Sequence, residues 1–403
     1  MRFCLALLLC CASLSVAGDW PQWLGPNRDG TSPERVAPWK GDLKILWRGE
    51  VGEGHSSPIA AGGLVFLHTK VKGKEEELIQ AFDAKSGDKK WEQTYSKPAF
   101  TTLFGNGPRG TPCVHDGKLY TFGITGTLAC WEAKSGQPLW KADVLEDAKK
   151  HNLFFGLSAS PLVVGENVVV QGGGSGSKGI KAFDLKTGKL TWTAGDDPAS
   201  YAAPVLLDKN IVVLTGANLT SITPAGEVRW KFPFKDKLNE SSTTPIKIDE
   251  YFVAGSVTAG TVVVKETSKT EVAQVWKNPA LTCYFSTPVV VSKEHYFVVT
   301  GMIGLNPTVT LRCVESATGK EIWKKPSVGK YHAALLKLAD GNLLMHDDST
   351  GNLTLLAPNV KEYQELAKSK AGGSTWAHPA IADGKVFIRD NKELICLSLG
   401  SSQ

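Results

Sequence analysis

Eight short segments of this chain place polar or aromatic side chains at one equivalent position. Each segment is a run of small residues that ends in proline, except that Leu335 replaces the proline in one of them. Arginine pairs with carboxylate or phosphate, aromatic rings stack, and histidine forms hydrogen bonds or titrates. The residues three places before the proline are His55, Arg109, Ser158, Tyr201, Ser242, Phe285, His332 and Trp376, and Tyr284 and Tyr331 each stand one place further back.

If the eight segments are equivalent in space, these side chains surround one opening. A concave site with rings and a few polar groups suits an aromatic or anionic small molecule. We therefore predict a ligand site made of His55, Arg109, Tyr201, Tyr284, Phe285, Tyr331, His332 and Trp376. A plainer alternative stays open, in which the opening is a water-filled channel mouth and Arg109 and His55 only satisfy loop carbonyl groups.

The other reactive residues predict no catalytic set and no metal centre. His346, Asp347 and Asp348 are adjacent, so their side chains would point in different directions along a strand. The glycine-rich segment 172–177 lacks the Lys-Ser/Thr ending of a phosphate-binding loop. Widely spaced cysteines in apolar segments indicate buried free thiols rather than disulfides or metal ligands. These cysteines are Cys113, Cys130, Cys283, Cys313 and Cys396.

The elements that must position these residues are predicted by an internal repeat. An acidic residue, two spacers, Ser or Thr, Gly, three spacers and Trp recur along the chain, as in Asp83, Ser86, Gly87 and Trp91. Further clear copies end at Trp140, Trp192 and Trp323. A period of 40 to 50 residues with several short strands is typical of a β-propeller. The acidic residue is expected to cap the turn, and the tryptophan to wedge between neighbouring blades.

The repeat predicts an all-β, eight-bladed propeller with four-stranded antiparallel blades. Trp47 lies in a strand, residues 43–50, that precedes the first full unit, and the last unit stops after three strands. We expect this N-terminal strand to complete the last blade, which ties the two ends together and protects an otherwise open edge. A seven-bladed ring is the alternative, because two units have lost parts of the motif, around Glu266 and around Leu366.

Residues 1–18 have the pattern of a cleaved signal peptide, and residues 19–403 are expected to form one propeller domain. Arg2, a short apolar run and Ser15-Val16-Ala17 supply the three parts of the signal. We therefore expect a periplasmic or extracellular protein that does not span the membrane and has no lipid anchor. The formal charge of +5 is small for 403 residues, and without a basic cluster nucleic acid is not an expected partner.

The repeats ending at Trp91 and Trp192, the segment 19–30 and the segment 105–112 resemble the pyrroloquinoline-quinone-like (PQQ-like) propeller family. The resemblance covers nearly the whole chain after residue 18. It implies either a quinone-dependent dehydrogenase with PQQ and calcium, or a scaffold of outer-membrane assembly that binds proteins and no quinone. The dehydrogenases of the family are longer and often carry an adjacent cysteine pair near the quinone. The one such pair here, Cys10-Cys11, lies in the signal.

These observations favour a binding or scaffold protein of the periplasm or cell envelope, with a protein or envelope component as its partner, over an enzyme. No cofactor is expected on this interpretation. The first alternative is a small dehydrogenase that holds PQQ and calcium in the axial opening. A hydrolase or lyase that uses His55 and His332 is the third hypothesis, and the histidine pair is its only support.

Overall fold

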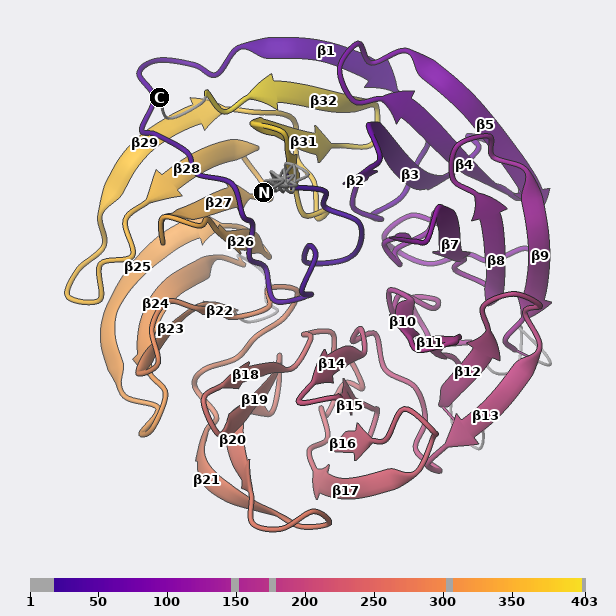
Figure 1. The fold of residues 1–403 in the computed structure, drawn as a ribbon. Coiled ribbons are helices and arrows are strands. Elements are labelled where there is room, and N and C mark those ends of the chain that lie inside the picture. Colours follow the sequence, from indigo (N-terminus) through magenta and orange to yellow (C-terminus); the bar gives the residue numbers. More distant parts are fainter. Residues whose placement is uncertain (1–17, 146–151, 174–178, 302–306, 401–403) are drawn as a thin grey trace, which may run out of the picture.

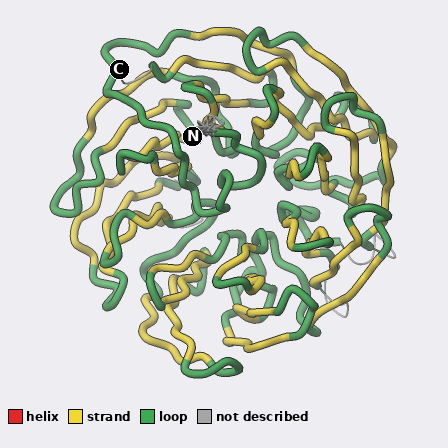
Figure 2. The backbone as a smooth tube through the Cα atoms, in the orientation of Figure 1, coloured by secondary structure: helices red, strands yellow, loops and turns green. Residues whose placement is uncertain are grey.

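The computed structural model describes residues 18–145, 152–173, 179–301 and 307–400. Every regular element in these ranges is a β-strand, and the strands form eight four-stranded antiparallel sheets arranged in a ring (Figures 1 and 2). The predicted eight-bladed propeller is therefore confirmed, and the seven-bladed alternative is wrong. No helix in this part of the chain is long and apolar enough to cross a bilayer.

The strands follow one another from the axis to the rim in each blade. The first blade contains β2(Ile59–Ala61), β3(Leu64–Lys70), β4(Glu76–Asp83) and β5(Lys89–Ser96), and the second contains β6(Cys113–His115), β7(Lys118–Phe122), β8(Thr127–Glu132) and β9(Pro138–Asp143). The third blade contains β10(Leu162–Val164), β11(Asn167–Gln171), β12(Ile180–Asp184) and β13(Leu190–Ala194), and the fourth contains β14(Val205–Leu207), β15(Asn210–Leu214), β16(Asn218–Ile222) and β17(Val228–Pro233). The fifth blade contains β18(Ile246–Ile248), β19(Tyr251–Ser256), β20(Gly260–Glu266) and β21(Val272–Asn278), and the sixth contains β22(Val289–Val290), β23(His295–Gly301), β24(Val309–Glu315) and β25(Glu321–Gly329). The seventh blade contains β26(Ala333–Lys337), β27(Leu343–Asp347), β28(Asn352–Leu356) and β29(Glu365–Lys370).

The eighth blade joins the two ends of the chain. It contains β30(Ala380–Ala382), β31(Lys385–Arg389), β32(Glu393–Ser398) and, outermost, β1(Ile45–Glu50). Trp47 of β1 pairs with Cys396 of β32. The expected closure by the N-terminal strand is confirmed, and β1 covers the edge of β32 that would otherwise be open.

The repeated turn and the repeated tryptophan hold neighbouring blades together. The Asp83 carboxylate accepts hydrogen bonds from the backbone N–H groups of Lys85 and Ser86, at 2.9 and 3.0 Å. Trp47 lies against the same turn and donates its indole N–H to the Ala84 carbonyl at 3.2 Å. Gly87 has φ +80, and a Cβ there would stand 2.6 Å from the Trp47 ring. The motif therefore serves packing between blades, as predicted.

The two degraded units keep this contact by other means. In the fifth blade the Glu266 side chain, and not a backbone carbonyl of the turn, accepts the Trp230 indole N–H at 2.7 Å. In the seventh blade the Asn359 carbonyl accepts the Trp323 indole N–H at 3.1 Å. Both blades have all four strands, because the hydrogen bond and the burial of the ring matter more than the acid-Gly turn itself.

The segment 19–32 crosses the axis of the ring (Figure 1). Trp20 pairs with Ala60 of β2 in the first blade, and Thr31 bridges to Lys337 of β26 in the seventh. Trp20, Leu24 and Arg28 are buried. Arg28 donates to the carbonyls of Ser160 and Pro161 in the third blade, at 3.0 and 2.7 Å, and Trp23 donates to the Thr244 hydroxyl of the fifth at 2.9 Å. A segment tied to blades on all sides of the ring closes its central channel.

The sequence also makes predictions for the N-terminal residues, the glycine-rich segment and the cysteines. The signal peptide predicted for residues 1–18 lies, apart from Gly18, outside the described residues, as do residues 174–177 of the glycine-rich segment. Within the described ranges the five cysteines are free and buried, which confirms the prediction of unpaired thiols.

Candidate functional site

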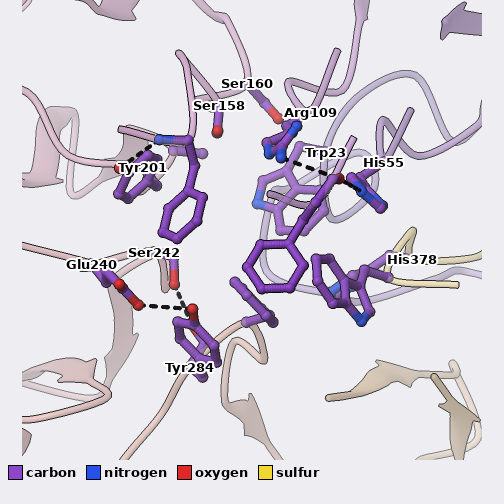
Figure 3. Close-up of a pocket in the computed structure, with 15 residues that line it drawn as sticks. Trp23, His55, Arg109, Ser158, Ser160, Tyr201, Glu240, Ser242, Tyr284 and His378 are labelled. Atoms are coloured by element: carbon purple, nitrogen blue, oxygen red, sulfur yellow. Dashed lines mark hydrogen bonds between the residues drawn. The ribbon is translucent and has the colours of Figure 1, made fainter. Parts of the chain in front are cut away.

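A funnel opens where the loops that precede the innermost strands meet. Its volume is about 870 Å³, counted out to the open mouth. Figure 3 shows side chains from several loops pointing into one space. The lining residues are Trp23, His55, Phe104, Arg109, Phe155, Ser158, Ser160, Tyr201, Ala203, Glu240, Ser242, Tyr284, Phe285, Trp376 and His378.

The structure brings together six of the eight residues predicted from sequence: His55, Arg109, Tyr201, Tyr284, Phe285 and Trp376 all line the funnel. Tyr331 lines a smaller cavity beside it, together with His55 and Trp376. The Tyr331 ring meets the Trp376 ring edge-on, with the centroids 5.8 Å apart. Tyr331 therefore extends the aromatic wall rather than facing the main space.

His332 does not line the funnel. It is buried, and its Nδ1 atom lies 2.9 Å from the Ser286 hydroxyl. The reason is the missing proline of the seventh blade. Leu335 has the N–H that proline lacks, so β26 begins at Ala333 and pairs with β27 through Leu335 and Met345. The strand therefore starts earlier than in the other blades, and His332 packs inside.

Several lining residues were missed by the sequence reasoning. Trp23 comes from the segment that crosses the axis, and only the resemblance of residues 19–30 to the family marked that segment. Phe104 and Phe155 lie in long loops that the repeat does not align. His378 carried a usable signal, because it directly precedes Pro379 at a position where the other seven units have Ser, Thr or Ala.

Aromatic rings form a continuous wall centred on Trp376. Its ring centroid lies 5.2 Å from that of Phe285, 5.4 Å from that of Phe104 and 4.8 Å from that of His55. Phe104 continues to Phe155 at 5.8 Å, and Phe155 to Tyr201 at 5.8 Å. Such a wall offers stacking and edge contacts to an apolar or planar group.

Arg109 is the cationic group of the funnel. Its guanidinium donates to the carbonyls of Phe104, Gly105 and Gly107 at 3.2 to 3.4 Å. It forms no ion pair with an acidic residue of the described ranges. Burial lowers the pKa of Arg109 to about 10, so the group stays protonated at neutral pH.

His55 is neutral and helps to shape the loop. Burial, followed by the nearby charge of Arg109, lowers the pKa of His55 to about 3. Its Nε2 atom donates to the Phe104 carbonyl at 2.8 Å. Both His55 and Arg109 thus satisfy loop carbonyls, as the plainer interpretation expected, and both also line the funnel.

The remaining titratable groups of the funnel are Glu240 and His378, besides the tyrosines. The Tyr284 hydroxyl donates to the Glu240 carboxylate at 2.7 Å, and burial raises the pKa of Glu240. His378 lies at the floor with its ring centroid 4.5 Å from that of Trp23, and burial lowers its pKa to about 3. Nowhere in the described ranges do three His, Cys, Asp or Glu side chains converge to hold a metal ion.

The fold and the site define this protein as an eight-bladed β-propeller with an axial funnel that is closed at its floor. A family profile described as "Outer membrane protein assembly factor BamB" matches residues 31–109 and 101–325. The match covers more than half of the chain, so the chain belongs to this family of PQQ-like propellers.

Individual relatives include an outer membrane assembly factor, alcohol dehydrogenases and a tetrathionate hydrolase. The outer membrane protein assembly factor BamB of Yersinia pestis is 25% identical over 224 residues, which are 53% of this chain and 52% of the relative. The quinohemoprotein alcohol dehydrogenase ADH-IIG of Pseudomonas putida is 32% identical over 195 residues, which are 44% of this chain and 26% of the relative. The chain thus spans about half or less of these relatives.

Solved structures of an alcohol dehydrogenase and of an assembly factor share the fold. The quinohemoprotein alcohol dehydrogenase of Comamonas testosteroni has a TM-score of 0.70 at 13% identity, over 97% of this chain and 82% of that one. BamB of Moraxella catarrhalis has a TM-score of 0.62 at 13% identity, over 88% of this chain and 97% of that one. At this identity the likeness concerns the fold alone.

Proposed function

We propose that this protein is an exported binding protein of the cell envelope, formed by one domain, residues 19–403, and that the funnel is its binding site. The observation that carries the proposal is the composition of the funnel, which combines a wall of rings with an arginine that has no carboxylate partner among the described residues. The signal pattern of residues 1–18 supports export. The relatives named as outer membrane assembly factors support a protein or envelope component as the partner.

The two histidines of the funnel favour binding over general base catalysis. General bases work best with a pKa near the operating pH. His55 and His378 both have a pKa lowered to about 3 by burial, and so are weak bases at neutral pH. The three serines of the lining lack a histidine with a suitable pKa beside them. No pair of nucleophile and base can be assigned among the described residues that line the funnel.

The proposal is tested by capture from envelope extracts with chemical crosslinking. The native protein is compared with Trp376→Ala, which removes the centre of the aromatic wall, and with Lys186→Ala, an exposed change in a repeat turn. Capture of a defined partner should be lost with Trp376→Ala and kept with Lys186→Ala. Equal capture by all three proteins would show that the funnel is not the binding site.

A quinone-dependent dehydrogenase is the second candidate, favoured by the stacked wall around Trp376, which suits a planar ring system. The fit to PQQ is poor in two respects. PQQ is a tricarboxylate, whereas the funnel offers one arginine opposed by one glutamate. Calcium also needs several oxygen ligands, and no acidic cluster lies in the described ranges. Titration with PQQ and Ca²⁺ decides, since saturable binding near one equivalent that requires Arg109 would favour this candidate.

A further inference from the structure

We propose that the occupant of the funnel is the C-terminal end of a protein chain, with an aromatic last residue whose free carboxylate pairs with Arg109. This inference rests on the proposed binding function and specifies the partner. Three features carry it: the closed floor, the loosely held arginine and an exposed apolar surface that continues outward from the aromatic wall.

The closed floor favours a chain end over a chain interior. Segment 19–32 is tied to the first, third, fifth and seventh blades, so nothing passes along the axis below Trp23. An internal loop would have to enter and leave by the same mouth, and both arms would need partners for their buried backbone groups. A chain end brings one arm only and places its terminal group deepest.

Arg109 is partly exposed and differs from the two buried arginines near the axis. Arg389 donates to the carbonyls of Gly54 and Gly52 at 2.6 and 2.7 Å, and Arg28 donates to Pro161 at 2.7 Å. Arg109 donates at 3.2 to 3.4 Å and faces the funnel. A carboxylate offers a guanidinium shorter and stronger charge-assisted bonds than carbonyls at that distance. The geometry of Arg109 therefore suits a carboxylate supplied by the occupant.

The surroundings of Arg109 define the last residue and its neighbour. The rings of Phe104, Phe285 and Trp376 suit an aromatic side chain beside the terminal carboxylate. Among the described residues that line the funnel, Glu240 supplies the one carboxylate, which accepts a hydrogen bond from the Tyr284 hydroxyl. It would repel an acidic residue next to the chain end but accept a hydrogen bond from a backbone N–H.

An apolar rim, made of Leu103 and Phe154, extends the site beyond one residue. These two side chains are 78% and 69% exposed, the highest values among the large apolar side chains of the described ranges. Phe154 packs edge-on against Phe155 with centroids 4.8 Å apart, and Phe155 lines the funnel. Exposed apolar surface that adjoins a pocket is typical of protein interaction sites. The rim therefore suits the apolar residues that precede the chain end, which a small aromatic acid lacks.

The test uses three probes and the purified protein. The first is a fluorescent hexapeptide that ends in Leu-Leu-Phe with a free carboxylate, the second is its C-terminal amide, and the third is N-acetylphenylalanine as a competitor. The free acid should bind, and amidation should weaken binding about tenfold or more, the size of one lost charge-assisted bond. N-acetylphenylalanine should compete weakly, because it does not reach the rim.

Variants separate the carboxylate from the rim. Arg109→Gln should weaken binding of the hexapeptide acid about tenfold and leave binding of the amide unchanged. The control Arg48→Gln, at an exposed ion pair on β1, should change the binding of neither peptide. Phe154→Ser, at a side chain that is 69% exposed, should weaken binding of the hexapeptide but not of N-acetylphenylalanine. Thermal unfolding checks that each variant is folded.

Three results would overturn the inference. Equal binding of acid and amide removes the role of the carboxylate. Equal binding of hexapeptide and N-acetylphenylalanine means that a small aromatic acid is the ligand. Absence of binding by every probe rejects a C-terminal occupant. If partner capture nevertheless depends on Trp376, only this inference fails and the proposed binding function stands.

Discussion

Replacing Gly87 by alanine should destabilise the closure between the eighth and first blades. The new Cβ would lie 2.6 Å from Cδ2 of Trp47 and 2.7 Å from its Cγ, at a residue with φ +80. The left-handed backbone costs alanine about 1–2 kcal/mol, and forcing a methyl group into a packed contact costs a further 1–3 kcal/mol or so. We expect Gly87→Ala to lower the free energy of unfolding by about 2–5 kcal/mol.

A matched control separates the two contributions. Gly73 has φ +74, and a Cβ there would meet no atom within 4 Å. Gly73→Ala should therefore show the backbone cost alone, about 1–2 kcal/mol. Urea unfolding followed by circular dichroism measures both variants. Equal shifts of the midpoint for Gly73→Ala and Gly87→Ala would refute the argument that the repeat glycine is required by the tryptophan of the neighbouring blade.

Three further predictions follow from buried titratable groups. Burial opposes ionisation of Glu77, but His68 at 3.0 Å and hydrogen bonds from Tyr95 and Ile124 hold its pKa below the usual value. The ionised Glu77 carboxylate therefore stabilises the fold fully above about pH 4.5, and this stabilisation is lost as the pH falls. Glu77→Gln should lower the urea midpoint at pH 7 more than at pH 4. Burial lowers the pKa of His55 to about 3, so the folded state loses stability as the pH falls below about 6.5, the pKa of histidine in the unfolded chain. His55→Asn should reduce the loss of unfolding free energy between pH 7 and pH 5 by up to about 2 kcal/mol, and an unchanged pH dependence would contradict the burial argument. Burial raises the pKa of Cys113 and Cys283 to about 11, so a thiol reagent at pH 8 should react with them only after unfolding, and fast reaction of the native protein would contradict this.

The fold was predictable because its repeat has a local physical cause. The acid-x-x-Ser/Thr-Gly turn and its tryptophan make one contact between blades, and the copies of that contact mark the blades in the sequence. Trp47 marked the closing strand for the same reason, as it occurs before the first full unit. Blades five and seven were less certain, since Glu266 and Asn359 meet the same need with different atoms.

The site was predictable only where it follows the repeat. Seven of the eight residues three places before the aligned proline line the funnel, because each loop delivers the same position to the axis. The alignment placed His332 wrongly at the funnel, since Leu335 lets β26 start earlier. Trp23 could not be found by alignment, because a segment without a counterpart in the other blades carries it into the axis.

The order of synthesis has a consequence for segment 19–32 and β1. The residues that close the funnel floor and complete the eighth blade are made first, but their partners Lys337 and β32 are made last. During translation the N-terminal part therefore stays without these partners until residues 337 and 393–398 have been made. A chain that stalls before residue 393 has neither a closed ring nor a strand to hold β1, so quality control by proteases can distinguish unfinished copies from complete ones.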